Sequence, residues 1–228
     1  MIKMLVTISL SLGFVTACAN TAPTQTPNIP IADNETLALS RAKLGIAYLN
    51  NNNPTIAREN LIKAYSLAPN NLYVLLSFAH YYDVVGDTNS ANLSYQSALR
   101  SFPEDSYALN NYAAFLCKQE KYTQAQTLFN KALSNSSYLF IAASYENLGL
   151  CLLKSGEEIK AKESFERALA YQPDRVISLV QACQIDIKRK NYRSAKAKLK
   201  AYQQSFGPQK VTLELLLKLE KLDTTVKN

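Results

Sequence analysis

The sequence predicts an all-α protein: an α-α superhelix of about five helical hairpins followed by a C-terminal capping helix. The main observation is an internal repeat of 34 residues, in which small and large apolar residues return in register. Prolines and helix-breaking turns recur at the boundaries of the repeat. The composition agrees, because 47% of the 228 residues are hydrophobic and 19% are charged, which is too apolar for a disordered chain.

Residues 1–17 indicate a secretory signal peptide. Lys3 supplies a positive start, and the apolar stretch after it is shorter than the roughly 20 residues that span a bilayer. Residues 15–18 (Val-Thr-Ala-Cys) resemble the bacterial lipobox, which implies cleavage before Cys18 and acylation of its thiol. An ordinary signal peptide followed by a chance cysteine is the alternative. Ala19, rather than an aspartate, follows the cysteine, and this implies sorting to the periplasmic face of the outer membrane.

Residues 18–32 are expected to form the lipidated N-terminus and a linker, since residues 19–32 contain three prolines and no charge. Fully extended, this stretch reaches roughly 45–50 Å. The formal net charge of the chain is +7, and removal of residues 1–17 takes away only Lys3. The basic residues alternate with acidic ones, as in residues 160–167, so no nucleic-acid partner is expected. Such a surface would still favour anionic membrane headgroups.

The repeat divides residues 33–209 into units that begin with residue 38 and are followed by a capping helix, residues 210–223. A two-residue insertion around residues 136–140 separates the third and fourth units. The fifth unit is weaker and has Asp186 where the first has Tyr48. The predicted units are 38–71, 72–105, 106–139, 142–175 and 176–209.

Each unit reads as two antiparallel helices, here called A and B. One set of small residues is expected where the two helices approach most closely: Gly45, Ala79, Ala113 and Gly149. A second set starts the B helix against the A helix: Ala57, Ala91, Ala125, Ala161 and Ala195. Prolines such as Pro69 end the B helix, because the residue before a proline avoids the helical conformation. These positions resemble the tetratricopeptide repeat (TPR) family over about three quarters of the chain; an all-α bundle with accidental spacing is the alternative.

Four cysteines are present, and one of them is the predicted lipidation site Cys18. Cys117 and Cys151 fall at similar heights on neighbouring A helices, and the predicted periplasm is oxidising, so a disulfide between them is expected. Two buried free thiols are the alternative. Cys183 takes a small-residue position and is predicted to pack in the core.

Catalytic patterns are missing from the sequence. His80 is the only histidine, the cysteine spacings do not suggest zinc, and there is no glycine-rich phosphate loop. We therefore expect that the protein is not an enzyme and binds neither a metal nor a cofactor. A carboxylate-based hydrolase is the alternative.

The A helices are expected to line a concave groove that binds a partner. The second, fifth, ninth, twelfth and thirteenth positions of each unit are predicted to be exposed there, and they are unusually apolar, which favours a hydrophobic ligand segment. The alternative is that the N-terminal segment or internal packing covers them. The predicted groove residues are Tyr73, Leu76, His80, Asp83, Tyr107, Asn110, Glu146, Leu150 and Gln184.

Residues 108–117 and 144–151, with the lipobox and the insertion between the third and fourth units, resemble the PilF/PilW family of type IV pilus biogenesis lipoproteins. Ala113-Ala114 replaces the usual Gly-Thr, and the last repeat is degenerate. The resemblance implies a pilotin, expected to be a monomer, that helps the outer-membrane secretin to localise and to assemble into its ring. Other pilus assembly proteins are further candidate partners. Leu76→Asp or Leu150→Asp should then abolish secretin capture without unfolding. Alternatives are an adaptor for proteases or cell-wall hydrolases, and an enzyme of unknown type.

Overall fold

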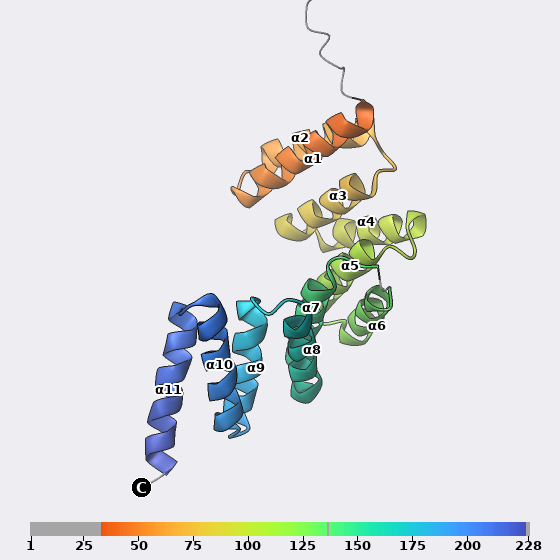
Figure 1. Ribbon diagram of the computed structural model, residues 1–228. Coiled ribbons are helices and arrows are strands. Elements are labelled where there is room, and N and C mark those ends of the chain that lie inside the picture. Colours follow the sequence, from red (N-terminus) through yellow and green to blue (C-terminus); the bar gives the residue numbers. More distant parts are fainter. Residues whose placement is uncertain (1–32, 136, 227–228) are drawn as a thin grey trace, which may run out of the picture. The chain divides into compact units, whose positions relative to one another are not determined.

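The computed structural model describes residues 33–135 and 137–226, and this part of the chain forms eleven helices and no strands. The predicted all-α class is confirmed (Figure 1). The predicted signal peptide, Cys18 and the linker to residue 32 lie outside the described residues. The helices are α1 Asn34–Asn50, α2 Pro54–Leu67, α3 Leu72–Val85, α4 Thr88–Ser101, α5 Ser106–Lys118, α6 Tyr122–Leu133, α7 Ile141–Lys154, α8 Glu158–Tyr171, α9 Val176–Lys188, α10 Tyr192–Phe206 and α11 Lys210–Val226.

The odd-numbered helices α1 to α9 are A helices, and each packs against the B helix that follows it. Each A helix also contacts the next A helix along the chain, so the hairpins stack in series. Helix α11 packs on α9 and α10, as expected of a capping helix. The first A helix begins earlier than residue 38, because the Asp33 side chain accepts a hydrogen bond from the Thr36 N–H at 2.7 Å and caps the helix.

The small residues lie where the sequence predicts a close approach of helices. A Cβ atom added to Gly149 would lie 2.7 Å from the ring of Phe165, and one added to Gly45 would lie 2.9 Å from Leu61 Cγ. The small residues that open the B helices have no exposed surface: Ala57, Ala91, Ala125, Ala161 and Ala195. A larger side chain at these places would hold the two helices apart.

The turn between the A and B helices has the same backbone in every hairpin. One residue there has a positive φ: Asn52 (57°), Gly86 (83°), Glu120 (60°), Gly156 (86°) or Lys190 (60°). Glycine adopts this left-handed conformation at little steric cost, whereas an ordinary L-residue does not. The two glycine turns could be recognised in the sequence, but nothing in the residue types marked Glu120 and Lys190.

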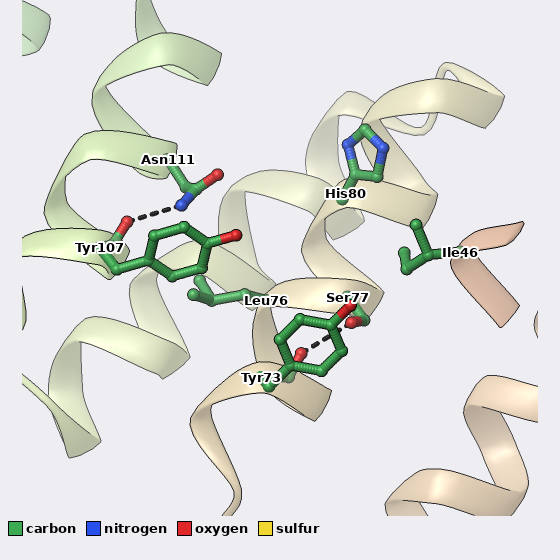
Figure 2. A pocket seen from close by; sticks show the side chains of 7 residues that line it. All are labelled: Ile46, Tyr73, Leu76, Ser77, His80, Tyr107 and Asn111. Carbon is green, nitrogen blue, oxygen red and sulfur yellow. Dashed lines mark hydrogen bonds between the residues drawn. The ribbon is translucent and has the colours of Figure 1, made fainter. Parts of the chain in front are cut away.

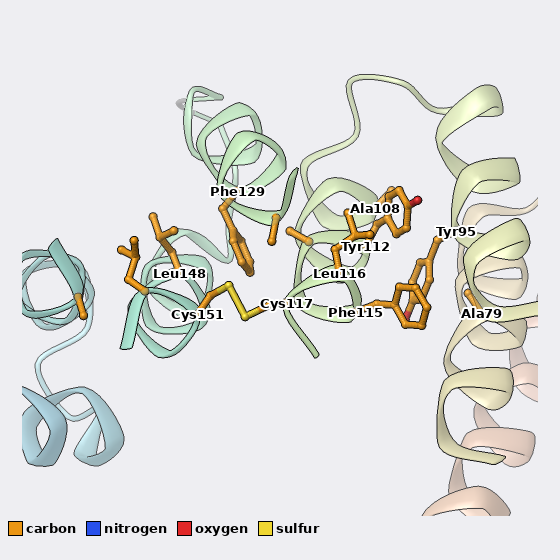
Figure 3. Close-up of a cluster of buried hydrophobic side chains, with 14 of the residues drawn as sticks. Ala79, Tyr95, Ala108, Tyr112, Phe115, Leu116, Cys117, Phe129, Leu148 and Cys151 are labelled. Carbon is orange, nitrogen blue, oxygen red and sulfur yellow. A yellow bond between two sulfur atoms is a disulfide. The ribbon is translucent and has the colours of Figure 1, made fainter. Parts of the chain in front are cut away.

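A disulfide joins Cys117 of α5 to Cys151 of α7, as the sequence predicts, with the two Cα atoms 5.7 Å apart (Figure 3). It crosses the junction between the third and fourth hairpins, beside the fully buried ring of Phe129. Cys183 is buried and unbonded to another cysteine. Burial raises the pKa of its thiol to about 12, so it stays protonated at neutral pH and acts as a small core residue.

None of the helices in the described ranges combines the length and the apolar character that crossing a membrane requires.

Candidate functional site

A stripe of residues runs along the open side of the A helices. It takes positions 2, 6, 9 and 13 of each repeat, counted from residues 38, 72, 106, 142 and 176. These positions share one narrow face, because a helix makes a turn in about 3.6 residues. Helices α1, α3 and α5 build from this stripe, together with Leu76 at position 5, a recess of about 240 Å³, here called the A-helix groove. Its lining residues are Ile46, Tyr73, Leu76, Ser77, His80, Tyr107 and Asn111.

The A-helix groove has an apolar floor and aromatic walls. Figure 2 shows Ile46 from α1 and Tyr107 from α5 pointing toward α3 from its two sides. Leu76, only 6% exposed, forms the floor, and Tyr107 is 39% exposed. The structure therefore brings together four of the nine predicted groove residues, namely Tyr73, Leu76, His80 and Tyr107.

The polar groups that line the groove are either satisfied or neutral. The Ser77 hydroxyl donates to the Tyr73 carbonyl at 2.7 Å, and the Asn111 amide donates to the Tyr107 carbonyl at 2.6 Å. Burial lowers the pKa of His80, and nearby Lys118 lowers it further, although Asp83 acts in the opposite direction. The imidazole is therefore neutral at pH 7, with one nitrogen able to donate and the other to accept a hydrogen bond. The groove suits an uncharged, apolar ligand segment.

A second, smaller recess of about 130 Å³ lies between α5 and α7. Leu150, another predicted groove residue, lines it together with both cysteines of the disulfide. Two lysines, Lys118 and Lys154, stand at its edge, so it is more basic than the A-helix groove. Gln184, in contrast, is exposed on α9 and lines neither recess.

The expectation that Asn110 and Glu146 are exposed in the groove is wrong. Asn110 is 7% exposed, and its side-chain amide oxygen, Oδ1, accepts from the Ser144 hydroxyl of α7 at 2.8 Å. Glu146 is 6% exposed and interacts with the start of α9. Its carboxylate accepts from the Arg175 guanidinium at 2.6 Å and from the hydroxyl and backbone N–H of Ser178 at 2.7 and 3.2 Å.

Glu146 thus acts as an N-cap supplied by another helix. Helix α9 begins after Arg175, whose own side chain does not cap it. The Glu146 carboxylate satisfies a free N–H of the first turn and places a negative charge at the positive end of the helix dipole.

Asn110 and Glu146 occupy position 5 of their units. The expectation that position 12 is exposed in the groove is also wrong. Asp83, at position 12 of α3, has a side chain only 10% exposed and pairs with Lys118 of α5 at 2.6 Å. Cys117, at position 12 of α5, bonds to α7. Positions 5 and 12 lie about 70–90° around the helix from the centre of the open stripe, because each residue turns the helix by about 100°. This flank faces the next A helix, and there Asn110, Glu146, Asp83 and Cys117 make contacts between helices. Leu76, also at position 5, is the exception that reaches the floor of the groove.

The residues that the sequence did not indicate occupy position 6: Ser77, Asn111 and Asn147. Their spacing from positions 2, 9 and 13, by four, three and seven residues, was the available signal. The polar character of these residues did not mark them, because each could equally have faced water.

A separate buried cluster explains the weak fifth repeat. Asp186 is fully buried, and Lys162 of α8 and Lys198 of α10 each approach its carboxylate to 2.8 Å. The Ser194 hydroxyl also donates to it at 2.9 Å. Burial raises the pKa of Asp186, but these hydrogen bonds outweigh it and lower the pKa below its usual value. The carboxylate is therefore charged and compensated. Among the described residues, no group of three or more His, Cys, Asp and Glu side chains could hold a metal ion.

Comparison with known proteins agrees with this architecture. The tetratricopeptide repeat family matches residues 105–174. An uncharacterised protein of Haemophilus influenzae is 36% identical over 119 residues, which cover 52% of this chain and 66% of that protein, just under two thirds of its length. The type IV pilus assembly protein PilF of Pseudomonas aeruginosa is 27% identical over 180 residues, which cover 79% of this chain and 71% of PilF.

Solved structures give the same result. The Pseudomonas aeruginosa PilF structure superposes with a TM-score of 0.73 at 25% identity, covering 84% of this chain and 86% of PilF. The crystal structure of PilW, described as a widely conserved type IV pilus biogenesis factor, superposes with a TM-score of 0.68 at 24% identity, covering 81% of this chain and 84% of PilW.

The stacked hairpins have the fold of tetratricopeptide repeat proteins, and residues 105–174 match that family in sequence. Within that class, the chain is homologous to the type IV pilus assembly protein PilF, and its fold matches those of PilF and PilW.

Proposed function

We propose that this protein is a lipid-anchored pilotin of the outer membrane, which binds the type IV pilus secretin and promotes its assembly. The observation that carries the proposal is an apolar, uncharged groove on the A helices of a chain homologous to PilF. Acylated Cys18 would hold the protein at the periplasmic face of the membrane, and the groove would hold a secretin segment until the secretin forms its ring.

The groove favours a segment with apolar anchors. Leu76 and Ile46 offer an apolar floor and edge, and the hydroxyls of Tyr73 and Tyr107 lie at the sides. Each apolar side chain that a ligand buries there would contribute about 1.5–3 kcal/mol. The neutral His80 ring supplies a hydrogen-bonding partner for a ligand backbone without attracting a charge.

The structure changes the choice of test variant. Leu76→Asp would place a carboxylate where only 6% of the side chain is exposed, so loss of binding could reflect unfolding. Tyr107→Ala is the better probe, because Tyr107 is exposed and lines the groove. Tyr171→Ala is its matched control: Tyr171 is an exposed tyrosine of α8 and lines neither recess.

The measurement is the affinity of each purified variant for the secretin, together with secretin multimer levels in cells that carry the variant. We expect Tyr107→Ala to weaken binding by at least about tenfold, which corresponds to about 1.4 kcal/mol, and Tyr171→Ala to leave it unchanged. Equal binding by both variants would rule out the groove. An envelope pull-down that returned cell-wall hydrolases or proteases and no secretin would favour the adaptor function instead.

The anchor is tested separately. Replacement of Cys18 by Ala should move the protein from the membrane fraction to the soluble periplasm and reduce secretin multimers, while the purified protein keeps its affinity for the secretin. A Cys18→Ala protein that stays in the outer-membrane fraction would contradict the proposed anchoring.

A further inference from the structure

Helix α3 has a second apolar face, on the side of the helix opposite the A-helix groove. Phe78 and Tyr82 lie about 160° around the helix from Leu76 and His80, because each residue turns the helix by about 100°. Together with the B helices α2 and α4, this face lines an open recess of about 540 Å³, here called the B-helix recess. Its volume lies within the roughly 300–1,000 Å³ that is usual for ligand sites. The B-helix recess shares no lining residue with the A-helix groove.

The walls of the B-helix recess are apolar and mainly aromatic. Tyr65 of α2 packs edge-on against Phe78 of α3, with the ring centroids 5.9 Å apart, and Phe78 stacks on Tyr82 at 6.2 Å. Tyr65 is 47% exposed, and Leu93 of α4 is 62% exposed. Large apolar side chains that gather in a recess and stay open to solvent indicate a binding surface for an apolar group.

One face of α4 adds polar groups to these walls. Ser97 and Arg100 follow Leu93 by four and seven residues, so the three share a face of the helix, and all three line the recess. Within the described part of the chain, no hydrogen bond or ion pair engages the Ser97 hydroxyl or the Arg100 guanidinium. The Ser77 hydroxyl of α3, by comparison, donates to the backbone carbonyl four residues earlier. The Ser97 and Arg100 donors are therefore available to a ligand.

The charge of Arg100 is not compensated by a neighbouring carboxylate. Among the described residues that line the recess, Arg100 alone is charged, and α4 contains no acidic residue. Glu104, the next acidic residue along the chain, pairs with Lys131 of α6 at 2.7 Å. The recess therefore presents a positive charge beside an aromatic surface, which is complementary to a carboxylate that stands near an apolar side chain.

We propose that the B-helix recess binds a proline-rich segment of a partner protein, in which an apolar residue and a glutamate stand three residues apart. Aromatic grooves recognise the polyproline II conformation, whose backbone carbonyls are free to accept hydrogen bonds. Leu93 and Arg100 are separated by about 10 Å along α4. Three residues of polyproline II span about 9 Å and make one turn, so both ligand side chains would face the recess.

The carboxylate is assigned to a glutamate side chain rather than to a chain terminus. Terminal carboxylates are captured by clusters of backbone N–H groups. Arg100 lies in the last turn of α4, where the free backbone groups are carbonyls. This site is distinct from the groove proposed for the secretin, and it would allow the protein to hold a second partner.

The test measures peptide binding by residues 19–228, which contain the compact unit Asp33–Asn228. The probe, here called the Glu peptide, is Ser-Pro-Phe-Pro-Pro-Glu-Pro-Ser with both ends blocked and a dye of zero net charge. In the Gln peptide, glutamine replaces the glutamate. Fluorescence anisotropy should show saturable binding, about tenfold tighter for the Glu peptide. Arg100→Gln should weaken binding of the Glu peptide by about tenfold and leave binding of the Gln peptide unchanged.

The matched control for the charge is Arg58→Gln, which removes an exposed arginine of α2 that lines neither the groove nor the recess. It should bind both peptides as the unmodified protein does. Leu93→Ala should weaken binding of both peptides by about fivefold, because it removes apolar surface but no charge. Tyr107→Ala, in the A-helix groove, should leave binding of the Glu peptide unchanged. Thermal unfolding should confirm that every variant folds.

Four outcomes would overturn the proposal. They are no saturable binding up to about 1 mM, equal affinity for the Glu and Gln peptides, equal losses in Arg100→Gln and Arg58→Gln, and loss of binding in Tyr107→Ala. A Gln peptide with a free terminal carboxylate that binds more tightly than the Glu peptide would also contradict the assignment to a glutamate side chain. The assay contains no secretin, so its failure leaves the proposed function intact.

Discussion

The clearest test of the structure is the substitution Glu146→Gln. If Glu146 were an exposed groove residue, the change would affect partner binding and leave stability unaltered. The structure instead places its carboxylate between α7 and α9, where it accepts hydrogen bonds from Arg175 and Ser178. The substitution should therefore destabilise the junction between the fourth and fifth hairpins.

The magnitude follows from what glutamine retains. Removing one partner of a buried ion pair costs about 3–5 kcal/mol when the other charge is left without compensation. Glutamine keeps one oxygen that can accept from the Ser178 hydroxyl, and the Arg175 side chain is 21% exposed, so water recovers part of its solvation. We therefore expect a loss of about 2 kcal/mol in the free energy of unfolding.

Urea unfolding followed by helical circular dichroism measures this loss. With a slope of about 2 kcal/mol/M, the midpoint of the transition that includes the fifth hairpin should fall by about 1 M. Glu163→Gln is the control, since Glu163 is exposed on α8, and its effect should stay within about 0.5 kcal/mol. An unchanged midpoint for Glu146→Gln, combined with weaker secretin binding, would refute the structural reasoning and restore Glu146 to the groove.

Three further predictions concern the turns, the disulfide and the buried aspartate. Glu120→Gly should raise the free energy of unfolding by about 0.5–1 kcal/mol in urea titrations, because its φ of 60° suits glycine better, and Gly86→Ala, at 83°, should lower it by about 1 kcal/mol. Reduction of the disulfide between Cys117 and Cys151, 34 residues apart, should cost up to about 4 kcal/mol, so a reductant should lower the melting temperature of the unmodified protein but not of Cys117→Ala. Folding lowers the pKa of Asp186 below its usual value near 3.8. The resulting stabilisation is fully present above that value and is lost as the pH falls through the folded-state pKa. Between pH 7 and pH 3, urea midpoints should therefore fall less steeply for Asp186→Asn than for the unmodified protein.

The fold could be predicted from the sequence because it depends mainly on the size of single residues, and these residues recur at a fixed spacing. Gly149 and the alanines that open the B helices are small for a steric reason that applies in every hairpin, and so they recur at 34 residues. The disulfide could be predicted for a related reason, since both cysteines belong to neighbouring A helices whose heights the repeat fixes.

The burial of the residues at positions 5 and 12 of the A helices could not be predicted in the same way. Asn110 and Glu146 are polar, and polar residues on a helix usually face water. Their burial depends on Ser144 and Ser178, which lie more than thirty residues away and carry no motif of their own. Asp186 presents the same difficulty, because its compensation comes from side chains of two other helices.

These buried polar contacts also bear on the order of the hairpins. Position 5 is Leu76 in the second repeat and Val180 in the fifth, so an apolar residue is sufficient for stacking there. At the two junctions around the fourth repeat, position 5 is instead polar and meets a serine at position 3 of the next A helix: Asn110 meets Ser144, and Glu146 meets Ser178. A buried polar residue without its partner costs more than an apolar pair gains, so a shifted or exchanged hairpin would leave Asn110 or Glu146 unsatisfied. The small residues therefore allow any hairpin to stack on another, while these pairs fix which hairpin follows which around the disulfide-linked centre of the stack.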